Sequence, residues 1–356
     1  MQGQTVLLVG AGASVAEAGP ARIRRAPPLD ASFFQLCRRA RLVRDTAVQD
    51  YLVANYGFNP FSAESRMEEV FNLLYSDVTS NPPPNGAIDA YWSLLTLYRR
   101  AISRTTNELS GSSRSGVGSL YRFLLRTFPN CRISFVTFNH DLLIEKALQL
   151  ASETRRYQHI SWNLRSAYGL RFARWPKPRG SRGSFSLHSE KSADGVHILK
   201  LHGSMNWLYP VSNLDDPKNA FRIPRGDLMC SNDSNIYPTY EISQREGYKD
   251  LVPLVVPPVY EKSEHISRVL SPVWNSAAEL IRSARNLIVF GYSMPDADLA
   301  ARSMLRRALY QGRELQHVHV IDVNPFVGSK ISSILNVATI SQYRTVSDFC
   351  RVHSAA

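Results

Sequence analysis

The stretch TVLLVGAGASVAEAG, residues 5–19, places a short run of strand-forming residues directly before a bare turn. Backbone N–H groups at the passage from a strand to a helix form an anion site, and glycines let a phosphate come close to them. The sequence therefore predicts a strand–turn–helix unit that binds the phosphates of a nucleotide, although a Gly-Ala-Gly sequence is also typical of a plain tight turn. The residues of this predicted turn are Gly10, Ala11, Gly12, Ala13 and Ser14.

The turn departs from the fingerprint of hydride-transferring dinucleotide enzymes. That fingerprint is G-x-G-x-x-G, with an acidic residue on a second strand about 20 residues later. Here Val15 stands at the third glycine position. Asp30 has about the right spacing, but it ends the segment ARIRRAPPLD, which is too rich in proline and charge for a central strand. Hydride transfer is therefore the least favoured function.

The composition is that of a folded globular protein with room for one large or two modest domains. The chain has 356 residues, of which 44% are hydrophobic and 20% charged. No apolar run approaches the length of a membrane span and no secretory signal is recognisable, so we expect a soluble cytoplasmic protein without membrane contact. The cysteines are far apart and form no C-x-x-C pair, which argues against structural zinc and against a disulfide framework. They are Cys37, Cys131, Cys230 and Cys350.

A net charge of +12 favours an anionic partner. Basic residues cluster at Arg22, Arg24 and Arg25 and again from Arg171 to Arg182. The second cluster is interspersed with Gly, Pro and Ser, which favours a solvated loop over a nucleic-acid contact. Contact with nucleic acid through this basic surface nevertheless stays open.

The segment 31–128 is predicted to be helical. Apolar residues recur at helical spacing in four stretches, and breakers such as Asn59-Pro60 and the triple proline at 82–84 separate them. The four stretches are 31–43, 65–78, 88–103 and 119–128. We therefore predict an all-helical subdomain, inserted at 31–128 after the first strand–helix unit.

Short apolar runs return after this insertion, and helical stretches follow several of them. The runs are 131–138, 195–203, 250–258, 286–293 and 317–325, and the helical stretches are 142–151, 266–284 and 296–311. This alternation predicts an α/β fold, a doubly wound, mostly parallel Rossmann-like sheet. The nucleotide-binding domain is then formed by residues 1–30 and 129–356.

Almost every predicted strand ends in polar or small residues. In open α/β sheets the ligand lies beyond the carboxyl ends of the strands, so these residues are candidates for a binding site. Each has an ordinary structural explanation, such as a helix N-cap, a core histidine or a turn. Their joint occurrence at one sheet edge favours a site instead. The candidates are Thr137, Asn139, Asp141, His202, Gly203, Ser204, Gly291, Ser293, Asp322 and Asn324.

Five motifs in this order, GAGAS, TFNHD, KLHGS, FGYSMPDAD and IDVNP, resemble those of the SIR2-like family. The likeness is strongest to the bacterial branch of NAD-cleaving anti-phage defence proteins. It extends from about residue 5 to residue 325 and does not include the helical insertion. The resemblance implies NAD⁺ as substrate.

The resemblance also assigns roles to the candidate residues. It implies that residues 10–14 hold the pyrophosphate and that Asn139 and Asp141 lie near the nicotinamide ribose. His202 matches the catalytic histidine of the family. Gly291 and Ser293 match the loop on the phosphate and adenosine side, and Asp322 with Asn324 the strand end near the adenine ribose. Thr137, Gly203 and Ser204 adjoin these positions.

Two departures separate the chain from the protein-deacylating sirtuins. Their two zinc-binding C-x-x-C pairs are missing, so no zinc is expected, and Phe138 stands where they usually have Gln. Both differences favour NAD⁺ hydrolysis over deacylation. A neutral histidine can accept a proton from a water or a ribose hydroxyl, and an amide can orient that group. We therefore predict an NAD⁺ glycohydrolase in which His202 and Asn139 are the catalytic residues.

An enzyme that destroys NAD⁺ must be silent in a healthy cell, yet the sheet and its insertion take up nearly all of the 356 residues. We therefore expect control by assembly, through a homo-oligomer and a partner such as a HerA-like ATPase. Two alternatives remain open: a non-catalytic nucleotide- or nucleic-acid-binding subunit, and an NAD-dependent protein deacylase.

Overall fold

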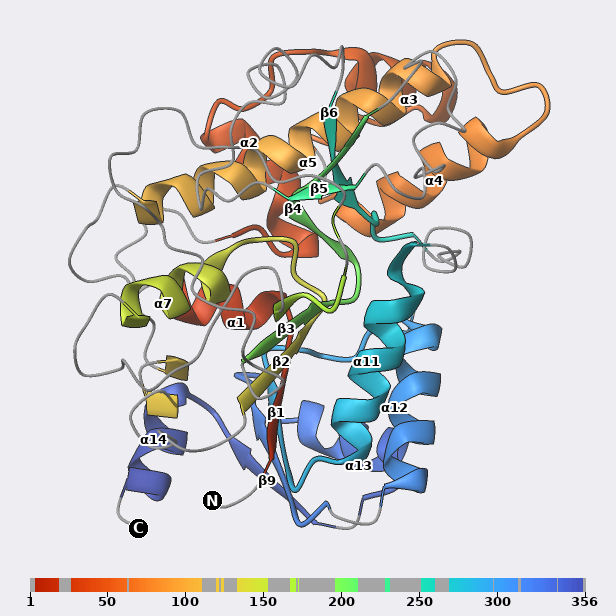
Figure 1. Cartoon of the computed structure of the whole chain (residues 1–356). Helices are drawn as coiled ribbons and strands as arrows, with labels where there is room; N and C mark the ends of the chain where they lie inside the picture. The colour runs from red at the N-terminus through yellow and green to blue at the C-terminus, as the bar shows by residue number, and fades with distance from the viewer. Residues whose placement is uncertain are drawn as a thin grey trace.

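The fold is that of a computed structural model of the chain, shown in Figure 1. It describes residues 4–18, 27–62, 64–110, 120–121, 123–124, 133–152, 167–170, 172, 196–210, 228–230, 251–259, 269–296, 298–312, 315–337 and 339–354. Cys131 lies outside these ranges. So do both predicted basic clusters, except that the structure describes Phe172 within the second one.

A six-stranded parallel sheet forms the centre of the fold. Its strand order is β3-β2-β1-β7-β8-β9, which is the order of a Rossmann sheet. The strands are β1 (Thr5–Val9), β2 (Ile133–Thr137), β3 (His197–Lys200), β7 (Asn286–Phe290), β8 (His317–Ile321) and β9 (Ile340–Tyr343). Every residue of β1, β2 and β7 is buried, because helices cover both faces of these central strands.

Helices flank the sheet on both sides, as predicted (Figure 1). On one side lie α1 (Ala11–Ala18), α7 (Leu143–Ser152) and α14 (Val346–Ser354), and on the other α11 (Ser271–Arg282), α12 (Leu299–Gln311) and α13 (Val327–Leu335). The strand order reverses between β1 and β7. In sheets of this kind the ligand crevice lies at that reversal, beyond the carboxyl ends of the strands.

The run 250–258 forms a strand, but the prediction that it joins the parallel sheet was wrong. It is β6 (Leu251–Val255) in a separate antiparallel sheet of order β5-β4-β6, with β4 (Gly203–Pro210) and β5 (Met229–Cys230). Pro253 has no N–H for a second neighbour, which confines β6 to an edge. Only residues 201 and 202 separate β3 from β4, too few for a crossover to another parallel strand.

A helical layer follows α1, as predicted, and has a hydrophobic core of its own. It comprises the short 3₁₀ helix η1 (Asp30–Ser32) with α2 (Phe33–Arg39), α3 (Ala47–Tyr56), α4 (Met67–Thr79) and α5 (Ala87–Ser110). Its core includes Met205, Val255 and Val259, so the small sheet packs into the layer. The domain boundaries at 30 and 129 stay predictions. None of the described helices is long and apolar enough to cross a bilayer.

The helix α14 covers a buried histidine on β8. His319 is 5% exposed, and its ring centroid lies 4.9 Å from that of His353 and 6.0 Å from that of His317. Neither ring nitrogen of His319 has a hydrogen-bond partner within the part of the chain that the structure describes. Burial, together with His353 and His317, lowers the pKa of His319 to about 4.

This pKa predicts that the protein loses stability as the pH falls from about 6.5 to about 4. In that range the unfolded state binds a proton at His319 that the folded state excludes, and a shift of this size corresponds to about 3 kcal/mol. Urea unfolding at pH 7 and pH 4.5 measures the loss. His319→Phe should reduce the pH dependence while His317→Ala at the exposed start of the strand keeps most of it; equal slopes in His319→Phe and wild type would contradict the prediction.

Candidate functional site

The loops that follow β1 and β7 interlock at the strand-order reversal. The N–H of Gly10 donates to the carbonyl of Phe290 (3.0 Å), and the N–H of Gly12 donates to that of Gly291 (2.9 Å). Gly291 has φ +58°, and a Cβ added to it would lie 2.0 Å from the nitrogen of Ala13. Glycine is therefore required here because two backbones touch.

This contact changes the interpretation of the predicted phosphate turn. The N–H groups of Gly10 and Gly12 are bound to the neighbouring loop, and that of Ala13 donates to the carbonyl of Gly10 (3.0 Å). Ala11 is exposed at the start of α1, and Gly12 is half-buried. An incoming phosphate would therefore meet the loop chiefly at the exposed Ala11, the first residue of α1, where the helix dipole favours an anion.

Ser14 joins the first loop to the one after β2. Its Oγ donates to Oδ2 of Asp141 (2.6 Å) and accepts from Nδ2 of Asn139 (2.8 Å). Nδ2 of Asn139 also donates to the carbonyl of Gly10 (2.9 Å). Both amide donors of Asn139 are thus used inside the protein, so a ligand could bond to this side chain only through its Oδ1.

Asp141 has two structural tasks. Oδ2 holds Ser14, and Oδ1 accepts from the N–H of Leu143 (3.1 Å) at the start of α7. It therefore closes an Asx turn just before α7, in place of the N-cap that the sequence allowed, and it also braces the first loop. Thr137 supports the same loop, because its Oγ1 donates to the carbonyl of Val9 (3.1 Å) and accepts from the N–H of Asn139 (3.0 Å).

A buried charge pair lies beneath this loop. Nζ of Lys200, 1% exposed, is 3.0 Å from Oε1 of Glu145 and donates to the carbonyl of Asp141. The hydroxyl of Tyr168 also donates to Oε1 of Glu145 (2.9 Å), and burial raises the pKa of Tyr168, which keeps this donor protonated. The side chain of Asn206 donates to Tyr168 in turn (3.0 Å). This network holds the carboxyl ends of β2 and β3 in register.

His202 lies at the end of β3, beside the loop that carries Asn139. The pairing of Thr137 with Lys200 puts Asn139 and His202 at equivalent positions two residues beyond their strands. The imidazole of His202, 7% exposed, contacts the ring of Phe138 at a centroid distance of 5.1 Å and that of Trp274 at 6.3 Å. An aromatic environment of this kind orients an imidazole and limits the access of water.

Phe138 connects the loop after β2 with the loop after β7. Its ring stacks on Tyr292 at 4.3 Å, and the hydroxyl of Tyr292 donates to Oδ2 of Asp298 (2.9 Å). Both rings are buried. Phe138 thus fills the space between His202 and the 291–293 loop with an apolar surface.

The remaining candidates differ in exposure. Ser293 is exposed, Gly203 begins β4, and Ser204 is buried with its Oγ donating to Asn206 (2.7 Å). Oδ1 of Asp322 accepts from the N–H of Asn324 (2.8 Å), whose Oδ1 accepts from the N–H of Phe326 (3.0 Å). Asp322 and Asn324 therefore shape a turn beyond β8, as the ordinary explanation predicted. Their contact with a ribose stays a prediction.

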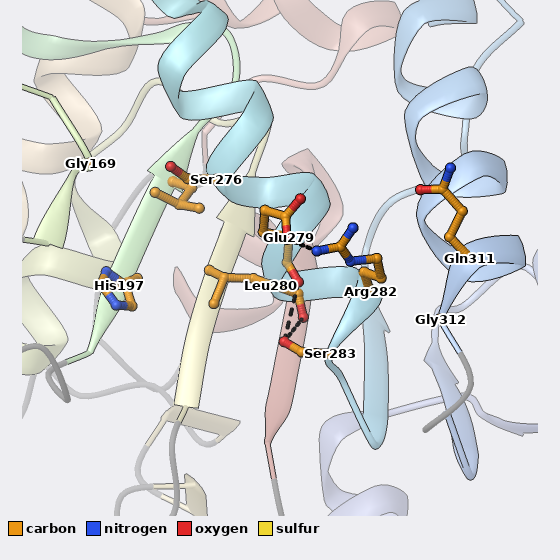
Figure 2. Close-up of a pocket in the computed structure, with 10 residues that line it drawn as sticks. Gly169, His197, Ser276, Glu279, Leu280, Arg282, Ser283, Gln311 and Gly312 are labelled. Atoms are coloured by element: carbon orange, nitrogen blue, oxygen red, sulfur yellow. Dashed lines mark hydrogen bonds and ion pairs between the residues drawn. The ribbon is translucent and has the colours of Figure 1, made fainter.

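The structure also has a cavity of about 640 Å³ away from these loops. Figure 2 shows its lining, which includes His197 at the start of β3, Arg282 at the end of α11 and Gly312 after α12. These helices run antiparallel to the strands, so their carboxyl ends lie at the amino edge of the sheet. The cavity is thus at the opposite edge from Asn139 and His202.

The sequence analysis did not identify three residues at the site: Lys200, Glu145 and Tyr98. Lys200 and Glu145 form the buried pair, and the hydroxyl oxygen of Tyr98 on α5 is 2.7 Å from Nδ1 of His140. A lysine in the otherwise apolar run HILKL was an available signal for a buried charge. Among the described residues, no group of three His, Cys, Asp or Glu could hold a metal ion.

The family model described as SIR2-like domain matches residues 133–331, more than half of the chain. The chain belongs to the SIR2-like family. The match begins at β2, and every candidate residue from Thr137 to Asn324 lies inside the matched region. The turn at residues 10–14 precedes it.

Solved structures similar to this SIR2-like chain include several Sir2 proteins. A Sir2 in complex with the inhibitor EX-527, 2′-O-acetyl-ADP-ribose and a deacetylated peptide is 13% identical, with 99% of this chain and 93% of that chain covered and a TM-score of 0.36. A mutant Sir2 homologue in complex with ADP-ribose is 14% identical, with 99% and 92% covered and a TM-score of 0.39. Values this low carry no argument about function. No curated protein matches the sequence.

Proposed function

We propose that this SIR2-like protein is an NAD⁺ glycohydrolase that cleaves NAD⁺ to nicotinamide and ADP-ribose. The observation that carries the proposal is the hydrogen-bonded unit of Ser14, Asn139 and Asp141, together with His202 at the equivalent position beyond the neighbouring strand β3. Family membership supports a dinucleotide substrate, and the exposed Ala11 at the start of α1 is where its pyrophosphate would approach.

The reaction needs no general acid, because nicotinamide leaves as a neutral molecule. The bond between C1′ of the ribose and the nicotinamide nitrogen breaks, and its electron pair goes to that nitrogen. Water adds to C1′, and the imidazole of His202 accepts its proton. In this proposal Oδ1 of Asn139 accepts a hydrogen bond from the water or from a ribose hydroxyl and so orients it.

The apolar contact between Phe138, Tyr292 and His202 favours hydrolysis over transfer to an acylated peptide. It closes the space beside the imidazole and offers no polar group for an acyl amide. Deacylation remains the second candidate, and it predicts that NAD⁺ is consumed only when an acylated peptide is present. A non-catalytic nucleotide- or nucleic-acid-binding subunit would leave NAD⁺ intact, and nucleic acid would bind in a salt-dependent manner.

We place the activity in anti-phage defence by depletion of NAD⁺. The toxicity of such a reaction calls for control, so we propose a homo-oligomer that acts with a protein partner such as a HerA-like ATPase. Light scattering of the purified protein, with and without its partner, tests the assembly. A stable and fully active monomer would contradict it.

Asn139→Ala and His202→Ala are each expected to reduce nicotinamide release about 100-fold or more, the usual loss when a group that handles the proton is removed. Release from NAD⁺ is followed by chromatography, for the protein alone and with its partner. Two controls match these substitutions at the other edge of the sheet: the buried Asn286→Ala on β7 and the half-buried His197→Ala on β3.

Both controls should retain activity and respond to the partner as wild type does. Activity that survives in both Asn139→Ala and His202→Ala would remove the proposed site. A requirement for acylated peptide would replace hydrolysis by deacylation.

A further inference from the structure

A hydrogen-bonded chain connects the helical layer to the backbone of His202. The hydroxyl oxygen of Tyr98 on α5 is 2.7 Å from Nδ1 of His140, and Nε2 of His140 is 3.0 Å from the carbonyl oxygen of His202. The three side chains are 6%, 5% and 7% exposed, so bulk water does not compete for these bonds. The rings also touch: Tyr98 meets His140 edge-on at 5.6 Å, and His140 stacks on His202 at 6.3 Å.

The chemistry of the three groups assigns the direction of each bond. A backbone carbonyl can only accept, so Nε2 of His140 carries the hydrogen. Nδ1 of a neutral His140 then accepts, and the phenol of Tyr98 donates to it. Burial raises the pKa of Tyr98, which keeps the phenol protonated and able to donate. The contacts thus specify one tautomer of His140.

The carbonyl of His202 is held from two sides. It accepts from Nε2 of His140 and also from the N–H of Val256 (2.8 Å), which follows β6. The carbonyl of His140 accepts from the N–H of Met205 on β4 (3.0 Å). The turn between β3 and β4, which carries His202, is therefore fixed by groups from α5, from the β2 loop and from the small sheet.

We propose that Tyr98 and His140 are positioning residues that orient the His202 imidazole, so that the helical layer sets the geometry of the reaction centre. This inference rests on the proposed function, because it assigns the purpose of the chain of contacts to His202 chemistry. A movement of α5 relative to the sheet would separate the phenol from Nδ1 and loosen the His202 turn. The helical layer is then the part of the protein through which binding of another molecule would regulate the site.

The first test is spectroscopic and does not need activity. In protein labelled with ¹⁵N-histidine, His140 should appear as the Nε2–H tautomer, and its signals are assigned by their loss in His140→Gln. Tyr98→Phe should shift Nδ1 of His140 and the ring signals of His202. Tyr91→Phe is the matched control, since Tyr91 is a buried tyrosine of the same helix that packs on Phe71; it should leave both histidines unchanged.

The second test is kinetic. Tyr98→Phe and His140→Leu should lower kcat for nicotinamide release about 10-fold or more, the loss found when a group that orients a catalytic ligand is removed, and leave KM for NAD⁺ within about two-fold. His140→Gln keeps a donor near the position of Nε2 and should recover most of the kcat lost in His140→Leu. Thermal unfolding of each variant reports the structural cost separately.

An Nδ1–H tautomer of His140, or His202 signals that do not respond to Tyr98→Phe, would overturn the inference. So would a kcat of Tyr98→Phe equal to that of Tyr91→Phe, or a Gln variant as slow as the Leu variant at equal stability. A wild-type protein that does not cleave NAD⁺ would refute the proposed function instead, and the NMR measurement alone would then decide whether Tyr98 controls His202.

Discussion

Gly291→Ala is expected to destabilise the protein by about 3–5 kcal/mol and to abolish NAD⁺ binding. The added Cβ would lie 2.0 Å from the nitrogen of Ala13 and 2.4 Å from the carbonyl carbon of Gly12, and φ at this position is +58°. Backbone strain and overpacking each cost about 1–3 kcal/mol. Relief requires the loop after β7 to part from the loop after β1, which breaks the bond from the Gly12 N–H. Urea unfolding and calorimetric titration with NAD⁺ measure the two effects.

Gly57→Ala separates the clash from the backbone strain. Gly57 caps the end of α3 with φ +71°, and among the described residues no atom beyond its chain neighbours lies within 4 Å of a Cβ placed there. It should cost only about 1–2 kcal/mol, the penalty for an L-residue in the left-handed region, and leave NAD⁺ binding unchanged. A Gly291→Ala variant no less stable than Gly57→Ala would show that the two loops are not locked together.

Lys200→Met is expected to cost about 3–5 kcal/mol, because it leaves the carboxylate of Glu145 buried without its cation. The same change removes the donor to the carbonyl of Asp141, so the loop that carries Asn139 should loosen and nicotinamide release should fall with stability. Chemical unfolding and the NAD⁺ assay on the same preparation measure both.

The double variant Lys200→Met with Glu145→Gln should recover part of the lost stability, since no uncompensated charge remains. Arg351→Met, which breaks an exposed pair with Asp348 on α14, is the surface control and should change stability little. If Lys200→Met behaved like Arg351→Met, the buried pair would have no structural role.

The parallel sheet was predictable because its strands are short, apolar and followed by helices. The pattern located β1, β2, β3, β7 and β8 and the helical layer, but it missed the exposed edge strand β9 and the amphipathic helices α3, α13 and α14. It also assigned β6 to the wrong sheet. Periodicity reports burial, and a strand such as LVPLV is equally apolar in either sheet; only Pro253 indicated an edge.

The candidate site shows the same division between local and distant information. The sequence indicates polar strand ends, and parallel pairing brings Asn139 and His202 to equivalent positions. It does not tell which strand lies beside β1, so the contact between Gly12 and Gly291 could not be foreseen. The pairing of Lys200 with Glu145 is equally distant along the chain. A turn rich in glycine therefore predicts close approach without identifying what approaches.

The core of the helical layer has a consequence for synthesis. Three of its apolar side chains, Met205 on β4, Val255 on β6 and Val259 just after β6, leave the ribosome long after α2 to α5. Until then the nascent helices expose the apolar surface that these residues later cover, which is a hazard for aggregation. The core of the helical layer can therefore be completed only after most of the polypeptide has been synthesised. The contacts from this layer that hold His202 in place also form only late in translation.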